Sequence, residues 1–135
     1  MWDNYGKVAI RATRHIQETR ECPKKTWQDF ADKTFGAGTY GANKGCPRYA
    51  YLGLCADGLV IGISKGNYIP ADNLNKLYAI QAVRMLYTDP SLENLRPKQL
   101  WDKVAEIIEE APDNHNNQMN VVLALWHEGM IIKPT

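Results

Sequence analysis

Apolar side chains recur at three- and four-residue spacing in six segments of the chain, and proline, glycine or asparagine bounds each segment. This spacing places the apolar groups on one face of a helix, so it predicts six helices. The expected helices occupy about 3–20, 26–35, 46–57, 73–88, 97–111 and 116–129. Short connections favour packing between neighbours, so we expect a mainly α fold: a single-domain, irregular orthogonal bundle over residues 1–135.

One short run departs from the helical pattern. Residues 59–63 are apolar and rich in β-branched side chains, which is typical of a strand. No other run offers a convincing partner, so we expect at most a short β segment there. The second helix shows a clear start signal, because Thr26 can cap it and Asp29 follows three residues later.

Composition narrows the class of protein. Apolar residues make up 44% and charged residues 23%, which is an ordinary globular balance. No apolar run approaches the roughly 20 residues that a membrane-spanning helix needs. The three cysteines lack the spacing of a disulfide framework, and the polar N-terminus lacks a secretory pattern. We therefore expect a cytoplasmic protein without a membrane partner.

The run from Gly36 to Gly45 carries a literal G-x-G-x-x-G pattern at 36–41. That pattern signals a dinucleotide site only after a strand and before a helix, and here a helix precedes it. The P-loop pattern fails as well, because glycine follows Lys44 where serine or threonine is required. We expect a tight glycine-rich connection and no cofactor.

An anion site is the most specific hypothesis for this region. Lys44 and Arg48 flank the start of the third helix, and Gly45 and Cys46 supply its first amides. Free N–H groups and the positive end of the helix dipole favour anions there. We expect a non-enzymatic binding or regulatory module that holds a small anion, or an acidic protein surface, within residues 36–48.

Two alternatives stay open. Cys46 sits at a helix start, where a lowered thiol pKa would suit a nucleophile in a cysteine-dependent enzyme. Nucleic-acid binding could use the basic first helix, with Lys7, Arg11 and Arg14. The net charge of +1 argues against the second alternative, although residues 1–48 carry nine Lys/Arg against five Asp/Glu. No metal-ligand spacing is present, so we expect no metal site.

A resemblance covers most of the chain. The stretch Lys44-Gly45-Cys46-Pro47-Arg48, followed by Leu-Gly-Leu-Cys at 52–55 and Gly-Leu-Val-Ile-Gly-Ile at 58–63, resembles an uncharacterised bacterial family. That family is classed as a domain of unknown function. Further similar stretches lie at 75–79, 100–104 and 117–122. The resemblance implies one full-length domain of bacterial or phage type, and it implies no activity, cofactor or functional residue.

Overall fold

The computed structural model describes residues 2–133, and the chain is helical through most of that range. In order, the elements are α1 (Asn4–Thr19), α2 (Pro23–Phe35), α3 (Tyr40–Asn43), α4 (Gly45–Ala56), α5 (Leu74–Thr88), the 3-10 helix η1 (Pro90–Asn94), α6 (Pro97–Ile107) and α7 (Gln118–His127). The prediction of a mainly α fold is confirmed. The extent expected for the domain, 1–135, includes positions 1, 134 and 135, which lie outside the described residues.

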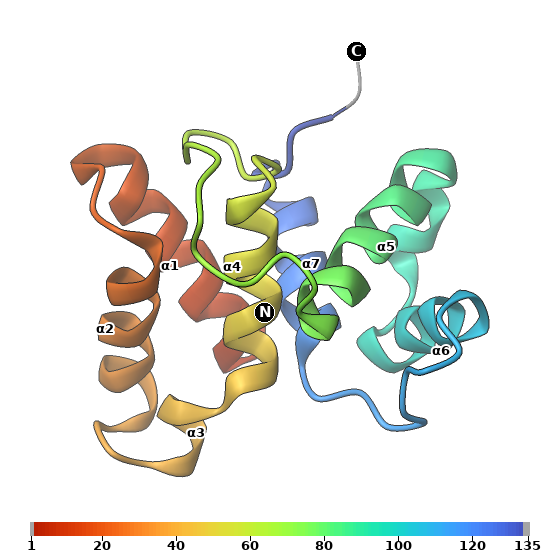
Figure 1. The fold of residues 1–135 in the computed structure, drawn as a ribbon, viewed down its shortest axis with the longest axis horizontal. Helices are drawn as coiled ribbons and strands as arrows, with labels where there is room; N and C mark the ends of the chain where they lie inside the picture. Colours follow the sequence, from red (N-terminus) through yellow and green to blue (C-terminus); the bar gives the residue numbers. More distant parts are fainter. Residues whose placement is uncertain (1, 134–135) are drawn as a thin grey trace.

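The helices form two flanking pairs around a central pair. Figure 1 shows α1 and α2 on one side, α5 and α6 on the other, and α4 and α7 between them. Helix α7 contacts α1, α4, α5 and α6, and it is apolar on nearly every side. Its burial completes one core, whose largest fully buried side chains include Trp27, Tyr51 and Trp101.

A glycine sets the spacing between α4 and α5. A Cβ placed on Gly53 would lie 2.5 Å from the Cβ and 2.7 Å from the Cα of Lys76. Because real Cβ atoms do not approach backbone so closely, any larger residue would force the two helices apart. The Leu-Gly-Leu-Cys stretch therefore has a packing role, since Leu52, Leu54 and Cys55 are buried beside this glycine.

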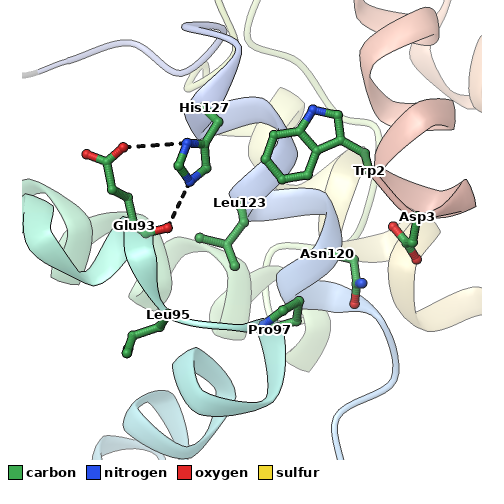
Figure 2. Close-up of a pocket in the computed structure, with 8 residues that line it drawn as sticks. All are labelled: Trp2, Asp3, Glu93, Leu95, Pro97, Asn120, Leu123 and His127. Atoms are coloured by element: carbon green, nitrogen blue, oxygen red, sulfur yellow. Dashed lines mark hydrogen bonds and ion pairs between the residues drawn. The ribbon is translucent and has the colours of Figure 1, made fainter.

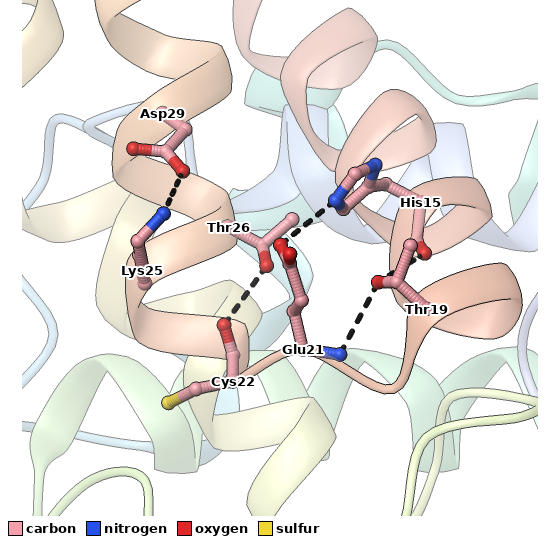
Figure 3. A network of polar contacts seen from close by, with 7 residues as sticks. All are labelled: His15, Thr19, Glu21, Cys22, Lys25, Thr26 and Asp29. Carbon is pink, nitrogen blue, oxygen red and sulfur yellow. Dashed lines mark hydrogen bonds and ion pairs between the residues drawn. The ribbon is translucent and has the colours of Figure 1, made fainter.

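The turn between α1 and α2 corrects one expectation. Helix α2 begins at Pro23, after Cys22 at the N-cap position, and not at Thr26. Proline suits a first helical turn because its missing N–H needs no acceptor there. The Thr26 hydroxyl donates to the carbonyl of Cys22, one turn back, as Figure 3 shows. In the same view the His15 ring lies 2.8 Å from the carboxylate of Glu21, which holds the turn against α1.

Two other segments contain short elements of structure. The glycine-rich run holds the short helix α3, capped by the Thr39 hydroxyl, which accepts from the amide of Ala42 at 3.2 Å. The run at 59–63 forms one antiparallel bridge, between Val60 and Ile131, and no further strand pairing exists in residues 2–133. The partner lies in the apolar tail 130–134, of which Pro134 is outside the described residues. The expectation of at most a short β segment is confirmed.

Candidate anion-binding site

The start of α4 is the centre of the predicted site. Lys44 is the N-cap residue, with extended backbone, and no side chain caps the helix. Gly45 and Cys46 therefore begin α4 with amides that precede the first intrahelical hydrogen bonds. Pro47 follows within the first turn, where its lack of an N–H costs nothing.

Lys44 reaches from α4 to the start of another helix. Its half-buried side chain donates from Nζ to Oδ1 of Asn117 at 2.6 Å. Nζ also lies 5.7 Å from the centroid of the Tyr5 ring on α1. Asn117 is the N-cap residue of α7, has a φ of 71°, and gives α7 no side-chain cap. Lys44 thus joins the first turns of two helices that both lack a capping side chain.

The two helices run in the same direction. In Figure 1 the first residues of both α4 and α7 lie at the lower end of the bundle. Each helix N-terminus carries the equivalent of about half a positive charge. The neighbouring α1 begins with a carboxylate cap, since Oδ1 of Asp3 accepts from the amide of Gly6 at 2.9 Å. Two uncapped N-termini and one ammonium group therefore concentrate positive potential at one place.

His115 lies close enough to Lys44 for its pKa to respond to the charge of that side chain. Burial lowers the pKa of His115, and the positive charges of Lys98 and Lys44 lower it further, while the carboxylates of Asp102 and Asp3 oppose part of this effect. Its Nδ1 atom is buried and has no hydrogen-bond partner among residues 2–133. A neutral imidazole beside Lys44 leaves one ring nitrogen able to meet an additional polar group.

Arg48, the fourth predicted residue, engages a different set of partners. Its Nη1 donates to Oε1 of Gln28 on α2 at 2.9 Å, and its guanidinium stacks on the Tyr49 ring at 5.0 Å. Gln28 in turn donates to the carbonyl of Ala42 at 2.9 Å. The structure therefore groups Lys44, Gly45 and Cys46 with the start of α7, and turns Arg48 toward α2.

The glycine-rich run serves turn geometry. Gly36 and Gly38 adopt φ values of 97° and 81°, which only glycine enters without strain. The Thr39 hydroxyl donates to the carbonyl of Gly36 at 2.7 Å and closes the turn. Helices lie on both sides of the G-x-G-x-x-G pattern, so no strand precedes it within the described chain.

Cys46, the alternative nucleophile, is half-buried, and no hydrogen bond joins it to a histidine in residues 2–133. His15 contacts Glu21, and His127 contacts Glu93. Cys55 is fully buried, and burial raises its pKa far above the ordinary thiol range. Neither thiol has the neighbouring base that a cysteine nucleophile requires.

The basic residues proposed for nucleic acid do lie together. Lys7, Arg11 and Arg14 are exposed on α1 and line a shallow groove of about 210 Å³ beside Trp2. One of the three charges is offset, because Arg14 forms a 3.1 Å ion pair with Glu128. The groove therefore presents two free cations and one neutralised one within the described residues.

A further pocket, which the sequence did not reveal, lies where α1, η1, α6 and α7 meet. It encloses about 300 Å³, and Figure 2 shows its lining residues: Trp2, Asp3, Glu93, Leu95, Pro97, Asn120, Leu123 and His127. Both ring nitrogens of His127 face Glu93, with Nε2 2.8 Å from its carbonyl and Nδ1 3.5 Å from its carboxylate. Two carboxylates make this pocket a poor host for an anion.

The described residues contain no cluster of three or more His, Cys, Asp or Glu that could hold a metal ion. None of the helices in residues 2–133 combines the length and the apolar character needed to cross a bilayer. The described residues thus form a small helical protein in which Lys44 joins the starts of α4 and α7, neither of which has a side-chain cap.

Comparison with known families places the chain. The model of a family of unknown function, DUF6979, matches residues 2–132, so the protein belongs to that family. No curated protein matches the chain, and no solved structure does. The resemblance seen in the sequence is confirmed at the level of a family of unknown function.

Proposed function

We propose that the protein is a binding or regulatory module that holds a small anion, or an acidic group of a partner protein, where α4 and α7 begin. Lys44 would neutralise the charge, and the amides of Gly45 and Cys46 would donate to the ligand. We expect this role in a bacterial cytoplasm, where thiols stay reduced.

One observation carries the proposal. Lys44 links the N-cap residues of α4 and α7 through its 2.6 Å hydrogen bond to Asn117, and neither helix has a side-chain cap. Helix starts normally receive a capping oxygen, so two adjacent uncapped starts leave donors for an external acceptor. The bond to Asn117 is to a neutral amide, and Lys44 forms no ion pair within residues 2–133.

The test is a titration of the protein with inorganic phosphate and with ATP, in which the NMR chemical shifts of the backbone amides are measured at each step. We expect shifts centred on Gly45, Cys46 and the first residues of α7. Because hydrogen bonds to charged groups contribute about 1.5–3 kcal/mol, Lys44→Ala should weaken binding at least tenfold. An anion bound there would also raise the pKa of His115, which is a second readout on the same sample.

Two variants serve as controls. Lys103→Ala removes the same charge from an exposed position of α6 and should leave binding unchanged. Arg48→Met should also bind phosphate normally, because its guanidinium contacts Gln28 on α2. Equal binding by wild type and Lys44→Ala, or no binding by either, would refute the proposal.

A second candidate function rests on the groove along α1. Lys7 and Arg11 beside Trp2 offer cations and an aromatic surface, the combination that single-stranded nucleic acids use. Binding of a short labelled oligonucleotide should then weaken steeply with salt and vanish in Lys7→Ala/Arg11→Ala. Flat fluorescence anisotropy at low salt would eliminate this candidate.

A further inference from the structure

A cavity of about 290 Å³ lies where the connection between α4 and α5 crosses α4. The residues lining it come from α2, from α4 and from that connection: Lys24, Arg48, Tyr49, Leu52, Tyr68, Ile69 and Pro70. Figure 1 shows the green connection passing over the middle of α4. The cavity is therefore built from three segments that are distant in sequence.

The charge of this cavity is one-sided. Lys24 and Arg48 line it, and none of its lining residues carries a carboxylate. Neither cation forms an ion pair within residues 2–133. By contrast, the pocket where α1, η1, α6 and α7 meet is lined by the carboxylates of Asp3 and Glu93. This cavity thus differs from that pocket in offering uncompensated positive charge.

Arg48 is hydrogen-bonded within the protein but keeps N–H donors that could bind a ligand. Nη1 donates to Gln28 at 2.9 Å and Nη2 donates to the Tyr49 hydroxyl at 3.3 Å. A guanidinium has five N–H donors in a planar fork that matches a carboxylate. The guanidinium carbon also lies over the Tyr49 ring, 5.0 Å from its centroid, and these contacts restrain the side chain before any ligand arrives.

The rest of the cavity wall is apolar or aromatic. Leu52 is only 3% exposed and forms a firm floor, while Ile69 and Pro70 come from the crossing connection. The Tyr68 hydroxyl donates to the carbonyl of Ser64 at 2.6 Å, which anchors its ring. Burial raises the pKa of Tyr68, so the phenol stays neutral and adds no negative charge.

We infer that this cavity binds a small carboxylic acid with an apolar body about the size of one ring, through Arg48 and Lys24. The volume lies close to the lower limit of the roughly 300–1,000 Å³ typical of ligand pockets, which suits a small molecule. The guanidinium would take the carboxylate in a bidentate pair, and the apolar body would pack on Leu52 and Ile69. This inference is independent of the anion site at Lys44.

The experiment uses phenylacetate as the probe and phenylacetamide as its neutral counterpart, each titrated into the full chain. We expect phenylacetate to bind with a Kd on the order of 1 mM and to shift the amides of Tyr49, Leu52 and Ile69. Phenylacetamide should bind at least tenfold more weakly, because it lacks the charge that Arg48 and Lys24 recognise.

Matched variants separate this site from the other. Arg48→Met keeps a long side chain without charge and should weaken phenylacetate at least tenfold, while phosphate binding stays normal. Lys24→Ala should weaken it severalfold, and Lys25→Ala should not, because Lys25 is engaged with Asp29 at 2.8 Å. Lys24 and Lys25 are exposed, so these two variants test the site even if Arg48→Met does not fold. Equal binding of the acid and the amide, shifts centred elsewhere, or no binding at 10 mM would each overturn the inference.

Discussion

Replacing Gly53 by alanine sets two physical effects against each other. Helix propensity alone predicts that the alanine variant is more stable by about 1 kcal/mol. In the structure, however, the new Cβ would lie 2.5 Å from the Cβ and 2.7 Å from the Cα of Lys76. Relief of that contact requires α4 and α5 to separate by roughly 1 Å, and overpacking of this kind costs about 1–3 kcal/mol.

Because the obstacle includes backbone, a change of side-chain rotamer cannot relieve it. The overpacking cost of about 1–3 kcal/mol less the propensity gain of about 1 kcal/mol predicts that Gly53→Ala lowers the free energy of unfolding by about 0–2 kcal/mol, equivalent to a fall in Tm of up to roughly 8 °C. Urea denaturation followed by circular dichroism measures this change. Ala105→Gly, on the outer helix α6, calibrates the propensity effect in the same protein. A stabilised Gly53→Ala would show that the α4–α5 contact is not as close as described.

Three further predictions concern the Thr13–Tyr51 hydrogen bond, the cysteines and His115. Thr13 and Tyr51 share a buried 2.8 Å hydrogen bond, so Thr13→Val and Tyr51→Phe should each cost about 1–3 kcal/mol in urea denaturation, and the double variant less than their sum. Iodoacetamide should label exposed Cys22 in the native protein while Cys55 reacts only after unfolding; fast native labelling of Cys55 would contradict its burial. The pKa of His115 lies below its ordinary 6.5, so the unfolded chain binds the proton more tightly and stability falls as the pH drops below about 6.5. His115→Gln should flatten that fall below about pH 6.5, and an unchanged pH profile would show that another group causes it.

The six longer helices were accessible from the sequence because their apolar faces repeat at helical spacing. The boundaries were less accessible where two local signals compete. At the start of α2, Thr26 and Asp29 form a plausible cap, but Pro23 begins the helix one turn earlier and leaves Thr26 buried. The short α3 was hidden, because four residues cannot show a period and glycines surround them.

In the candidate site, too, the sequence predicted the features that depend on neighbours in the chain and missed the contacts between distant residues. Local sequence placed Lys44, Gly45 and Cys46 at a helix start and Arg48 one turn later, because those relationships depend on neighbours in the chain. It could not show that Asn117, 73 residues away, would meet Lys44, or that Arg48 would turn to Gln28. It also could not reveal the cavity beside Arg48, whose walls come from α2, α4 and the connection to α5.

The sequence by itself determined the class of fold, the short β segment and the approximate positions of the six longer helices, since these follow from the spacing of apolar residues and from the conformational preferences of proline and glycine. Tertiary structure alone decided that α4 and α7 begin side by side. It also decided that Lys44 and Arg48, which the sequence predicted to bind one anion together, contact different helices: Lys44 contacts the start of α7 and Arg48 contacts α2. The reason is physical. Which helix starts lie together depends on how the whole core packs, and packing is a property of the complete set of buried surfaces rather than of any one segment.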